Sequence, residues 1–156
     1  MKVVRTSELF NMLQIPALGK YTSGTKLHTG TERCFVKKYN KYECVPVHMD
    51  YTMVLTYQTD NGQVTLCNSE DYENIYLASI SVTEKGKGIG TDLLNTILDY
   101  CDEKGYKLFL HPFPLDYTKE KFNLKKALPL FYKLRDWYKS FGFVEQSDGY
   151  MVYNPQ

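Results

Sequence analysis

The spacing of hydrophobic residues predicts strands in the first half of this chain, and alternating strands and helices in the second half. The clearest early signal lies at residues 51–57 and 63–67, which are both rich in β-branched, aromatic and aliphatic side chains. Asn61-Gly62 lies between these two runs. Because an Asn-Gly dipeptide between two β-prone segments strongly indicates a hairpin, we predict one here.

The residues before this hairpin carry weaker signals. Residues 6–13 combine polar cap residues with periodic apolar positions, which predicts a short helix that ends before Pro16. Residues 17–32 are rich in Gly, Thr and Ser and predict a loop, whereas residues 34–39 predict a strand.

Strands and helices alternate from residue 74 onwards. Residues 75–82 carry apolar side chains on both faces for much of their length, which is typical of a mostly buried strand. A helix is predicted from about Gly90, and Gly105 is expected to cap its C-terminal end. The pattern then predicts a strand over 106–110, a helix over about 128–141 and a bent strand or hairpin over 143–152. This alternation predicts α/β layers, with helices packed on a sheet.

Length and charge limit the class of protein. A chain of 156 residues is long enough for one domain and too short for two ordinary ones, so we expect a single domain over 1–156. The 19 Lys and Arg nearly balance the 18 Asp and Glu, so the overall basic charge of a nucleic-acid-binding protein is missing and we expect no nucleic-acid partner. Without a signal peptide or an apolar run of roughly 18 residues, we expect a cytoplasmic protein that does not contact membranes.

The cysteines and histidines do not have the spacing of a metal site. None of the four cysteines forms a CxxC pair. Cys34, Cys44 and His48 are the nearest approach to a ligand set, but their spacing is irregular for zinc. We therefore expect reduced thiols and no bound metal.

The glycines at positions 86, 88 and 90 lie between a predicted strand and a predicted helix. Such a turn presents backbone N–H groups at the positive end of a helix dipole, where a phosphate binds well. A nucleotide P-loop is excluded because Gly90 is not followed by the required Lys and Ser or Thr. A dinucleotide fingerprint is excluded because the glycine spacing differs from GxGxxG. A plain structural turn remains the alternative to a phosphate site.

Lys85-Gly86-Lys87-Gly88-Ile89-Gly90 resembles the acyl-CoA signature of the GNAT family of N-acetyltransferases, (Gln/Arg)-x-x-Gly-x-(Gly/Ala), with Lys85 where Gln or Arg is usual. A second segment, Trp137 to Phe143, resembles the (Leu/Phe)-Tyr-x-x-x-Gly-Phe ending of the last helix in that family. The resemblance covers residues 74–153. It implies a single-domain α/β (α+β) fold with a central, mixed, mostly antiparallel twisted sheet flanked by helices.

The resemblance also implies a function and a set of site residues. It predicts transfer of an acetyl group from acetyl-CoA to an amine by direct attack, with Tyr138 as the general acid and Tyr132 in reserve. In that family the loop holds the coenzyme A pyrophosphate, and the preceding strand pairs with the pantetheine arm. In this chain the resemblance implies that a strand N–H near residues 80–82 stabilises the oxyanion. The cofactor-binding residues predicted on this basis are Ile80, Val82, Lys85, Gly86, Lys87, Gly88, Gly90 and Thr91.

Other roles are less defined by the sequence. Candidates for ordering a water that deprotonates the amine are Glu73, Ser79, Ser81 and Asp116. For the two serines, a hydroxyl bonded to nearby backbone is the simpler interpretation. Residues 111–126 form a long connection, which we interpret as a wall or lid over the acceptor site or as a solvated insertion.

Two further functions remain open at this stage. One is a catalytically silent acyl-CoA-binding regulatory or interaction module, and the other is an interaction role without a cofactor. The acceptor is also open, since small-molecule amines, protein lysines and N-termini all fit. A homodimer is left open because exposed edge strands of such folds often pair.

Overall fold

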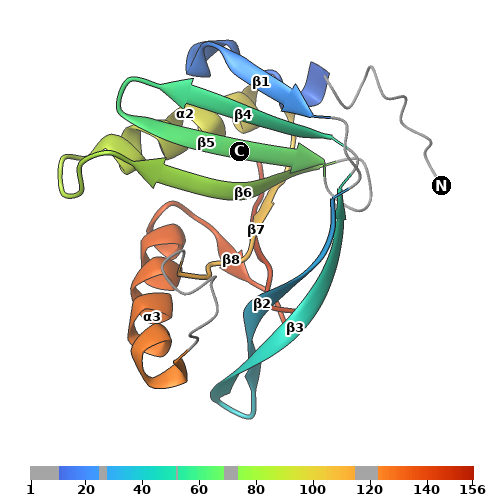
Figure 1. Ribbon diagram of the computed structural model, residues 1–156, viewed down its shortest axis with the longest axis vertical. Helices are drawn as coiled ribbons and strands as arrows, with labels where there is room; N and C mark the ends of the chain where they lie inside the picture. The colour runs from blue at the N-terminus through green and yellow to red at the C-terminus, as the bar shows by residue number, and fades with distance from the viewer. Residues whose placement is uncertain (1–10, 25–27, 52, 69–73, 115–122) are drawn as a thin grey trace. The chain divides into compact units, whose positions relative to one another are not determined.

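The computed structural model describes residues 11–24, 28–51, 53–68, 74–114 and 123–156 (Figure 1). The chain divides into two compact units, and each is described by itself. Unit 1 consists of Met1–His28, Asp50–Phe109 and Pro155–Gln156, and unit 2 of Thr29–Met49 and Leu110–Asn154. The α/β class predicted from the sequence is confirmed. No described helix has the length and apolar character needed to cross a membrane.

Unit 1 is built on a mixed, mostly antiparallel sheet with the strand order β1-β4-β5-β6-β7. Its strands are β1 (Tyr21–Gly24), β4 (Val54–Thr59), β5 (Gly62–Asn68), β6 (Ile75–Val82) and β7 (Leu108–Leu110). The first three pairings are antiparallel, and β7 runs parallel to β6. The helical elements described over their whole length are η1 (Pro16–Leu18) and α2 (Ile89–Lys104).

The predicted hairpin is confirmed as β4 and β5, but its glycine has another role than expected. Thr59 pairs with Gly62, so Asp60 and Asn61 form the turn and Gly62 is the first residue of β5. A Cβ atom at Gly62 would lie 2.5 Å from the backbone oxygen of Ser81 on β6. The glycine is therefore needed for the close approach of two strands.

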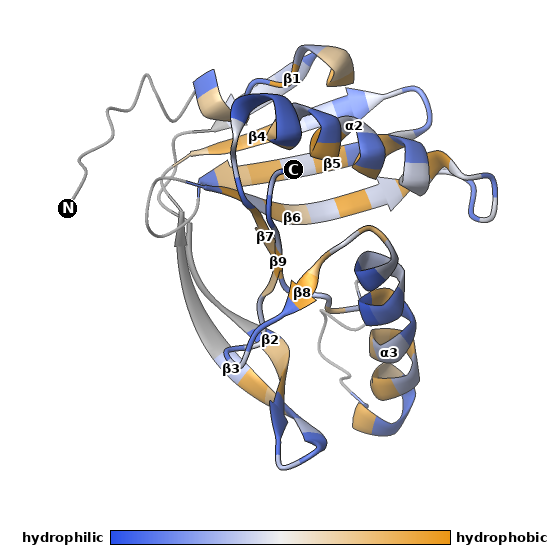
Figure 2. Ribbon diagram, turned by 180° about the vertical axis from the view of Figure 1, so that it is seen from behind, coloured by the Kyte–Doolittle hydropathy of each residue, from blue (hydrophilic) through white to orange (hydrophobic). Residues whose placement is uncertain are grey.

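Helix α2 packs its apolar face on β5 and β6, while its outer face is hydrophilic (Figure 2). The side chains of Leu94 and Ile97 on this helix are fully buried, as are those of Leu55 and Leu66 on the sheet. Gly105 ends the helix in the left-handed conformation, with φ of 75° and its N–H bonded to the Cys101 carbonyl, which confirms the predicted cap.

The prediction of a loop over residues 17–32 is wrong. Tyr21–Gly24 forms β1, which pairs with β4 along its whole length, and β2 begins at His28. The Tyr21 ring meets the Tyr57 ring edge-on, with centroids 5.6 Å apart. Tertiary pairing of this kind overrides the loop-like composition of the segment. Of the helix predicted over 6–13, residues 11–13 are helical and the others lie outside the described residues.

Unit 2 contains a long hairpin, one helix and a short hairpin. These elements are β2 (His28–Lys38), β3 (Lys41–Tyr51), α3 (Leu124–Ser140), β8 (Val144–Glu145) and β9 (Met151–Tyr153). Strands β2 and β3 form a two-stranded sheet joined by Tyr39 and Asn40, both with positive φ. The strand predicted over 34–39 is thus part of a longer one, except that Tyr39 lies in the turn. The hairpin predicted at 143–152 is confirmed as β8 and β9.

Helix α3 begins four residues before the predicted start at about Leu128. Asn123 caps it, since its side chain accepts a hydrogen bond from the Lys125 backbone N–H at 3.0 Å. The helix buries Phe131 against Phe35 of β2, with ring centroids 4.4 Å apart. Pro129 lies inside the helix rather than at its start.

Candidate functional site

The segment between β6 and α2 is an exposed turn built on glycine. Gly86 and Gly88 have φ values of 81° and 74°, and a Cβ atom added to either would meet nothing within 4 Å. Gly88 occupies the cap position of α2 without a side chain that could accept a hydrogen bond. The space in front of the first helical residues is therefore open to a ligand.

The first backbone N–H groups of α2 have no acceptor within the helix. The Asp92 N–H donates to the Gly88 carbonyl at 3.0 Å and closes the first helical turn. The N–H groups of Ile89, Gly90 and Thr91 come before this bond and have no partner four residues earlier in the helix. They lie at the positive end of the helix dipole, which favours an anion there.

The start of the turn is tied to the β4–β5 hairpin. Both the N–H and the hydroxyl of Thr83 donate to the Asn61 carbonyl, at 3.0 Å and 3.1 Å. Lys87 forms an exposed ion pair with Glu84 at 3.4 Å. Such a pair contributes little stability, so the ammonium group remains available to a ligand. Lys85 is exposed.

Strand β6 has one edge that only β7 borders, and that pairing is short. The pairs are Ile75 with Leu108 and Tyr76 with Phe109, whereas β5 pairs with β6 from Ile75 to Val82. Among the described strands, none pairs with this edge over residues 77–82. The strand therefore offers backbone donors and acceptors directly before the glycine turn.

A β-bulge in this strand was not predicted. Thr65 pairs with Ser79 and Leu66 with Leu77, so Ala78 has no partner on β5. A bulge re-aims the backbone groups beside it and often lies next to an active site. The sequence-based prediction placed the N–H that stabilises the oxyanion near residues 80–82, a few positions after Ala78. Nothing in the local sequence around Ala78 indicates the bulge.

Tyr138, the predicted acid, lies near the end of α3 in unit 2. Its ring meets Trp137 and Phe143 edge-on, with centroids 5.0 Å and 5.4 Å apart. Burial raises the pKa of Tyr138 to about 12, so its hydroxyl is protonated at neutral pH. Within the described part of the chain, this hydroxyl makes no hydrogen bond.

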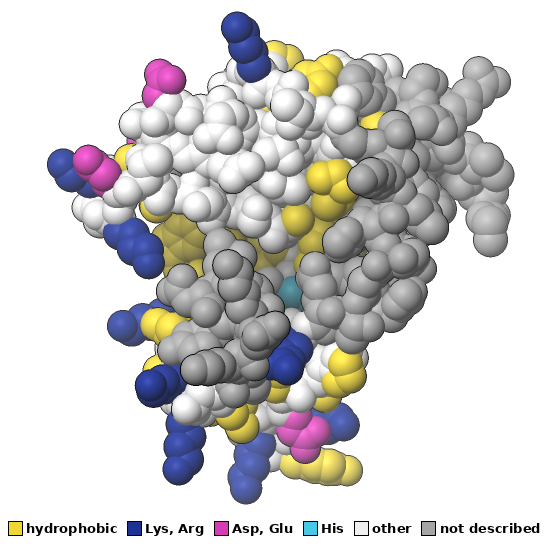
Figure 3. Space-filling model, in the orientation of Figure 1, with side chains coloured by type: hydrophobic (Ala, Val, Ile, Leu, Met, Phe, Trp, Pro, Cys, Tyr) yellow, Lys and Arg dark blue, Asp and Glu magenta, His cyan; other side chains and the backbone are white. Residues whose placement is uncertain are grey.

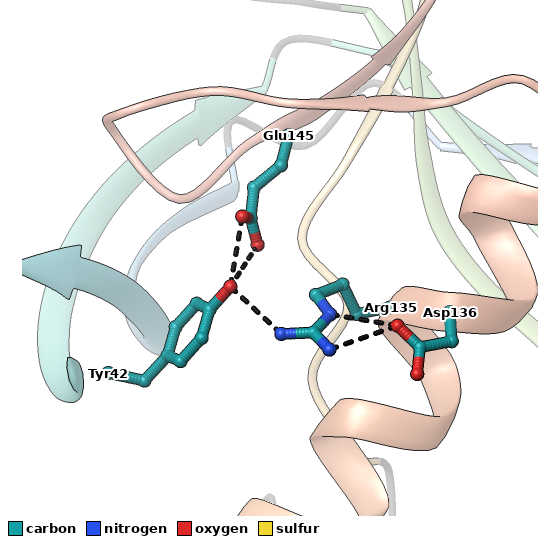
Figure 4. Close-up of polar contacts among 4 residues, drawn as sticks. All are labelled: Tyr42, Arg135, Asp136 and Glu145. Carbon is teal, nitrogen blue, oxygen red and sulfur yellow. Dashed lines mark hydrogen bonds and ion pairs between the residues drawn. The ribbon is translucent and has the colours of Figure 1, made fainter. Parts of the chain in front are cut away.

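A polar cluster that the sequence did not reveal joins three elements of unit 2 (Figure 4). The Tyr42 hydroxyl on β3 donates to the Glu145 carboxylate on β8, whose oxygens lie 2.9 Å and 2.7 Å away. The same hydroxyl accepts from Nη1 of Arg135 on α3 at 3.0 Å, and Arg135 also donates to Asp136. Burial and the bond to Glu145 raise the pKa of Tyr42, although Arg135 opposes this.

Aromatic rings surround the Arg135 guanidinium in this cluster. Its central carbon lies 4.9 Å from the ring centroid of Tyr132, 5.5 Å from that of Tyr42 and 6.0 Å from that of Phe131. Cation–π contacts of this kind stabilise a partly buried arginine. The ring of Tyr132, the reserve acid, therefore has a clear structural role.

His111 is a neutral histidine stacked on an aromatic ring. Its ring lies 3.8 Å from that of Tyr150, centroid to centroid. Burial lowers the pKa of His111 to about 4, so the imidazole is uncharged at neutral pH. Histidine spacing in the sequence bears only on zinc binding, so it gives no signal for this stacked ring.

No family model matches this chain, and no curated protein sequence matches it. Among solved structures, the anti-CRISPR protein AcrVA5 is similar, with a TM-score of 0.50 and 20% identity over 65% of this chain and 98% of that one. Nourseothricin acetyltransferase has a TM-score of 0.46 and 16% identity over 87% of this chain and 99% of its own. An acetyltransferase from Thermus thermophilus has a TM-score of 0.41 and 16% identity, over 65% and 62% of the two chains.

The strand order, the strand–glycine turn–helix connection and the match at a TM-score of 0.50 agree with the fold expected from the sequence. The chain has a GNAT-like fold. At 20% identity the likeness to AcrVA5 bears on the fold alone. At TM-scores below 0.5, the two acetyltransferases are too distant to carry an argument.

Within the GNAT-like fold, all the predicted cofactor-binding residues belong to unit 1. Ile80 and Val82 lie on β6, and the others occupy the turn and the first turn of α2. Tyr138 belongs to unit 2. Their roles stay predictions, since no ligand is present to test them.

The candidates for ordering a water are only partly described. Ser79 and Ser81 both lie on β6, where Ser79 is half-buried and Ser81 is exposed. Glu73 and Asp116 lie outside the described residues, as does half of the connection that we interpreted as a wall or lid. Across the described ranges, no group of three or more His, Cys, Asp and Glu residues could hold a metal. His48 falls where side chains are not described, so the expectation of no metal stays untested.

Proposed function

We propose that this chain is an acetyltransferase that moves the acetyl group of acetyl-CoA to an amine. One observation carries the proposal: the edge of β6 that no described strand covers beyond Tyr76 leads directly into an open glycine turn at the start of α2. An extended amide-bearing arm can pair with such an edge while a pyrophosphate meets the N–H groups of the turn. Acetyl-CoA has both parts in this order.

Each part of the coenzyme has candidate partners in the proposal. The edge of β6, including Ile80 and Val82, would pair with the pantetheine arm. The turn and the first helical residues, from Lys85 to Thr91, would hold the pyrophosphate, with Lys85 and Lys87 adding positive charge. We propose further that the whole chain, residues 1–156, acts as one domain.

The proposed reaction is direct attack of a neutral amine on the acetyl carbonyl carbon. A C–N bond forms, the C–S bond breaks, and the amine proton leaves to solvent or an ordered water. The thiolate takes a proton from the Tyr138 hydroxyl, which solvent then reprotonates. If the acceptor is a lysine, making it neutral costs about 4 kcal/mol near pH 7.5, which a desolvated site would reduce. A positioned general acid is typically worth about 10²–10⁴ in rate. A β6 backbone N–H near residues 80–82 would stabilise the oxyanion.

Calorimetric titration of the full chain with acetyl-CoA tests the cofactor, with ATP and NAD as comparison ligands. Micromolar binding of acetyl-CoA alone is expected, and Gly88→Glu should abolish it by filling the open turn with an acidic side chain. Gly105→Glu is the matched control, because Gly105 has a φ of 75° against 74° at Gly88 and is equally open. Absence of acetyl-CoA binding by folded wild-type protein would overturn the proposal.

Turnover is tested separately by release of free thiol in the presence of amine acceptors, both small molecules and lysine-containing peptides. Tyr138→Phe should lower kcat by about 10²-fold or more while acetyl-CoA binding is kept. Tight binding without thiol release from any acceptor would instead indicate a silent acyl-CoA-binding module.

A further inference from the structure

The nearly neutral charge of the whole chain conceals a difference between the two units. Unit 2 contains 11 Lys and Arg against seven Asp and Glu, whereas unit 1 contains eight against 11. The expectation of no nucleic-acid partner was based on the average of these two values. Local charge, rather than net charge, decides where an anionic polymer binds.

Five of the 11 Lys and Arg of unit 2 belong to two segments at one end of the unit. The turn of the β2–β3 hairpin and the first turn of α3 lie at the same end of this unit (Figures 1 and 2). Lys and Arg side chains project around that end of the molecule (Figure 3). We call this surface the basic end; its residues are Lys37, Lys38, Tyr39, Lys41, Lys125 and Lys126, all of them exposed.

Four of these five lysines make no ion pair with the described residues. Lys38 is paired with Glu43 at 3.4 Å, but both side chains are more than half exposed, at 55% and 57%. For the other four lysines of the basic end, the described residues provide no ion pair. Lys125 and Lys126 also lie in the first turn of α3, where the helix dipole disfavours cations. These charges therefore do little for the stability of the fold.

Tyr39 does not stabilise the fold either. It is 99% exposed, so its ring gains nothing from packing. It also has a φ of 49°, in a two-residue turn where Gly or Asn is usual because a bulky side chain is strained there. Strained, exposed residues of this kind are often retained for a function.

We propose that the basic end binds single-stranded nucleic acid, with phosphates at the lysines and a base stacked on Tyr39. An exposed aromatic ring with exposed lysines beside it in the chain, at positions 37, 38 and 41, supplies both interactions that such binding requires. An acidic protein segment would use the lysines but would gain little from a ring with both faces open. The inference does not depend on acetyl transfer, because none of these residues belongs to the proposed acetyl-CoA site.

The test is fluorescence anisotropy of a labelled, mixed-sequence single strand of about 20 nucleotides, titrated with the full chain at about 50 and 200 mM salt. Tyr39→Ala should weaken binding about tenfold, and Tyr39→Phe should bind like wild type because the stacking ring is kept. The double variant Lys37→Gln, Lys41→Gln should lower the slope of log Kd against log salt by about 1.4, or about 0.7 for each lost phosphate contact.

The matched control is the double variant Lys104→Gln, Lys107→Gln, which removes the same charge from exposed positions of unit 1. It should leave Kd nearly unchanged. Lack of binding by wild type, or equal weakening in this control, would overturn the proposal. A further result would also overturn it: a polyglutamate peptide displaces the labelled nucleic acid, and Tyr39→Ala has no effect on binding. That result would assign the surface to an acidic protein partner.

Discussion

In unit 1 the candidate site is made of backbone, whereas in unit 2 the polar chemistry is made of side chains joined across three elements. The turn before α2 offers open glycines and N–H groups at a helix start, and its one ion pair is exposed. In unit 2, Tyr42, Arg135 and Glu145 hold β3, α3 and β8 together through hydrogen bonds and aromatic contacts. A backbone site depends on local conformation, while a side-chain cluster depends on long-range packing.

Removing a core ring of unit 2 should have the largest effect on stability. Phe131 is 1% exposed and packs on Phe35, so Phe131→Ala should lower the free energy of unfolding by about 3–5 kcal/mol. Trp137, the chain's one tryptophan, reports on unit 2 by fluorescence, and far-ultraviolet circular dichroism reports on both units. If the chain is one domain, as proposed, both signals should give the same denaturant midpoint, and Phe131→Ala should lower both midpoints equally. Two separate transitions would contradict that proposal.

Acid should destabilise unit 2 through His111. In the unfolded chain this imidazole takes up a proton near pH 6.5, whereas burial lowers its folded-state pKa to about 4. Stability is therefore fully present above pH 6.5 and falls as the pH drops from 6.5 to 4, by about 1.4 kcal/mol per pH unit at most. Denaturant unfolding across this range measures the slope. His111→Gln should flatten it, and an unchanged slope in that variant would show that other groups cause the loss.

The Arg135 cluster should contribute a smaller amount. Arg135→Gln removes the cation from the aromatic rings and a donor from Tyr42, so the free energy of unfolding should fall by about 1–3 kcal/mol. Arg135→Lys should recover little of this lost stability, because an ammonium group lacks the planar guanidinium with its several N–H donors. Asp136→Asn is the control: its side chain is 64% exposed, so the loss should stay below about 0.5 kcal/mol. Equal losses in both variants would show that the cluster adds nothing beyond a surface pair.

These regions also differ in what the sequence could predict. The bounds of β6, the helix after it and the cap at Gly105 follow from local periodicity and glycine positions, and so does the turn between β6 and α2. The Tyr42–Glu145 contact joins residues 103 positions apart, and no local pattern indicates it. The same holds for β1, whose composition is that of a loop until β4 pairs with it. The bulge at Ala78 likewise depends on the register with β5.

The smallest expected effect compares two exposed ion pairs, one in each unit. Lys87–Glu84 and Lys38–Glu43 both have an N–O distance of 3.4 Å and similar exposure. Glu84→Gln and Glu43→Gln should each change the free energy of unfolding by less than about 0.5 kcal/mol. The two variants should differ only in ligand binding.

Glu84→Gln should tighten acetyl-CoA binding about two- to threefold at low salt, because it releases Lys87 and removes a carboxylate near the proposed pyrophosphate site. Glu43→Gln makes the same chemical change in unit 2, to which no residue of that site belongs, and should leave acetyl-CoA affinity unchanged. Calorimetric titration of both variants at low and high salt measures the difference, which should shrink as salt screens the charges. Equal affinities for the two variants at low salt would mean that Lys87 does not meet the pyrophosphate, and would leave the turn's backbone N–H groups and Lys85 as its only proposed partners.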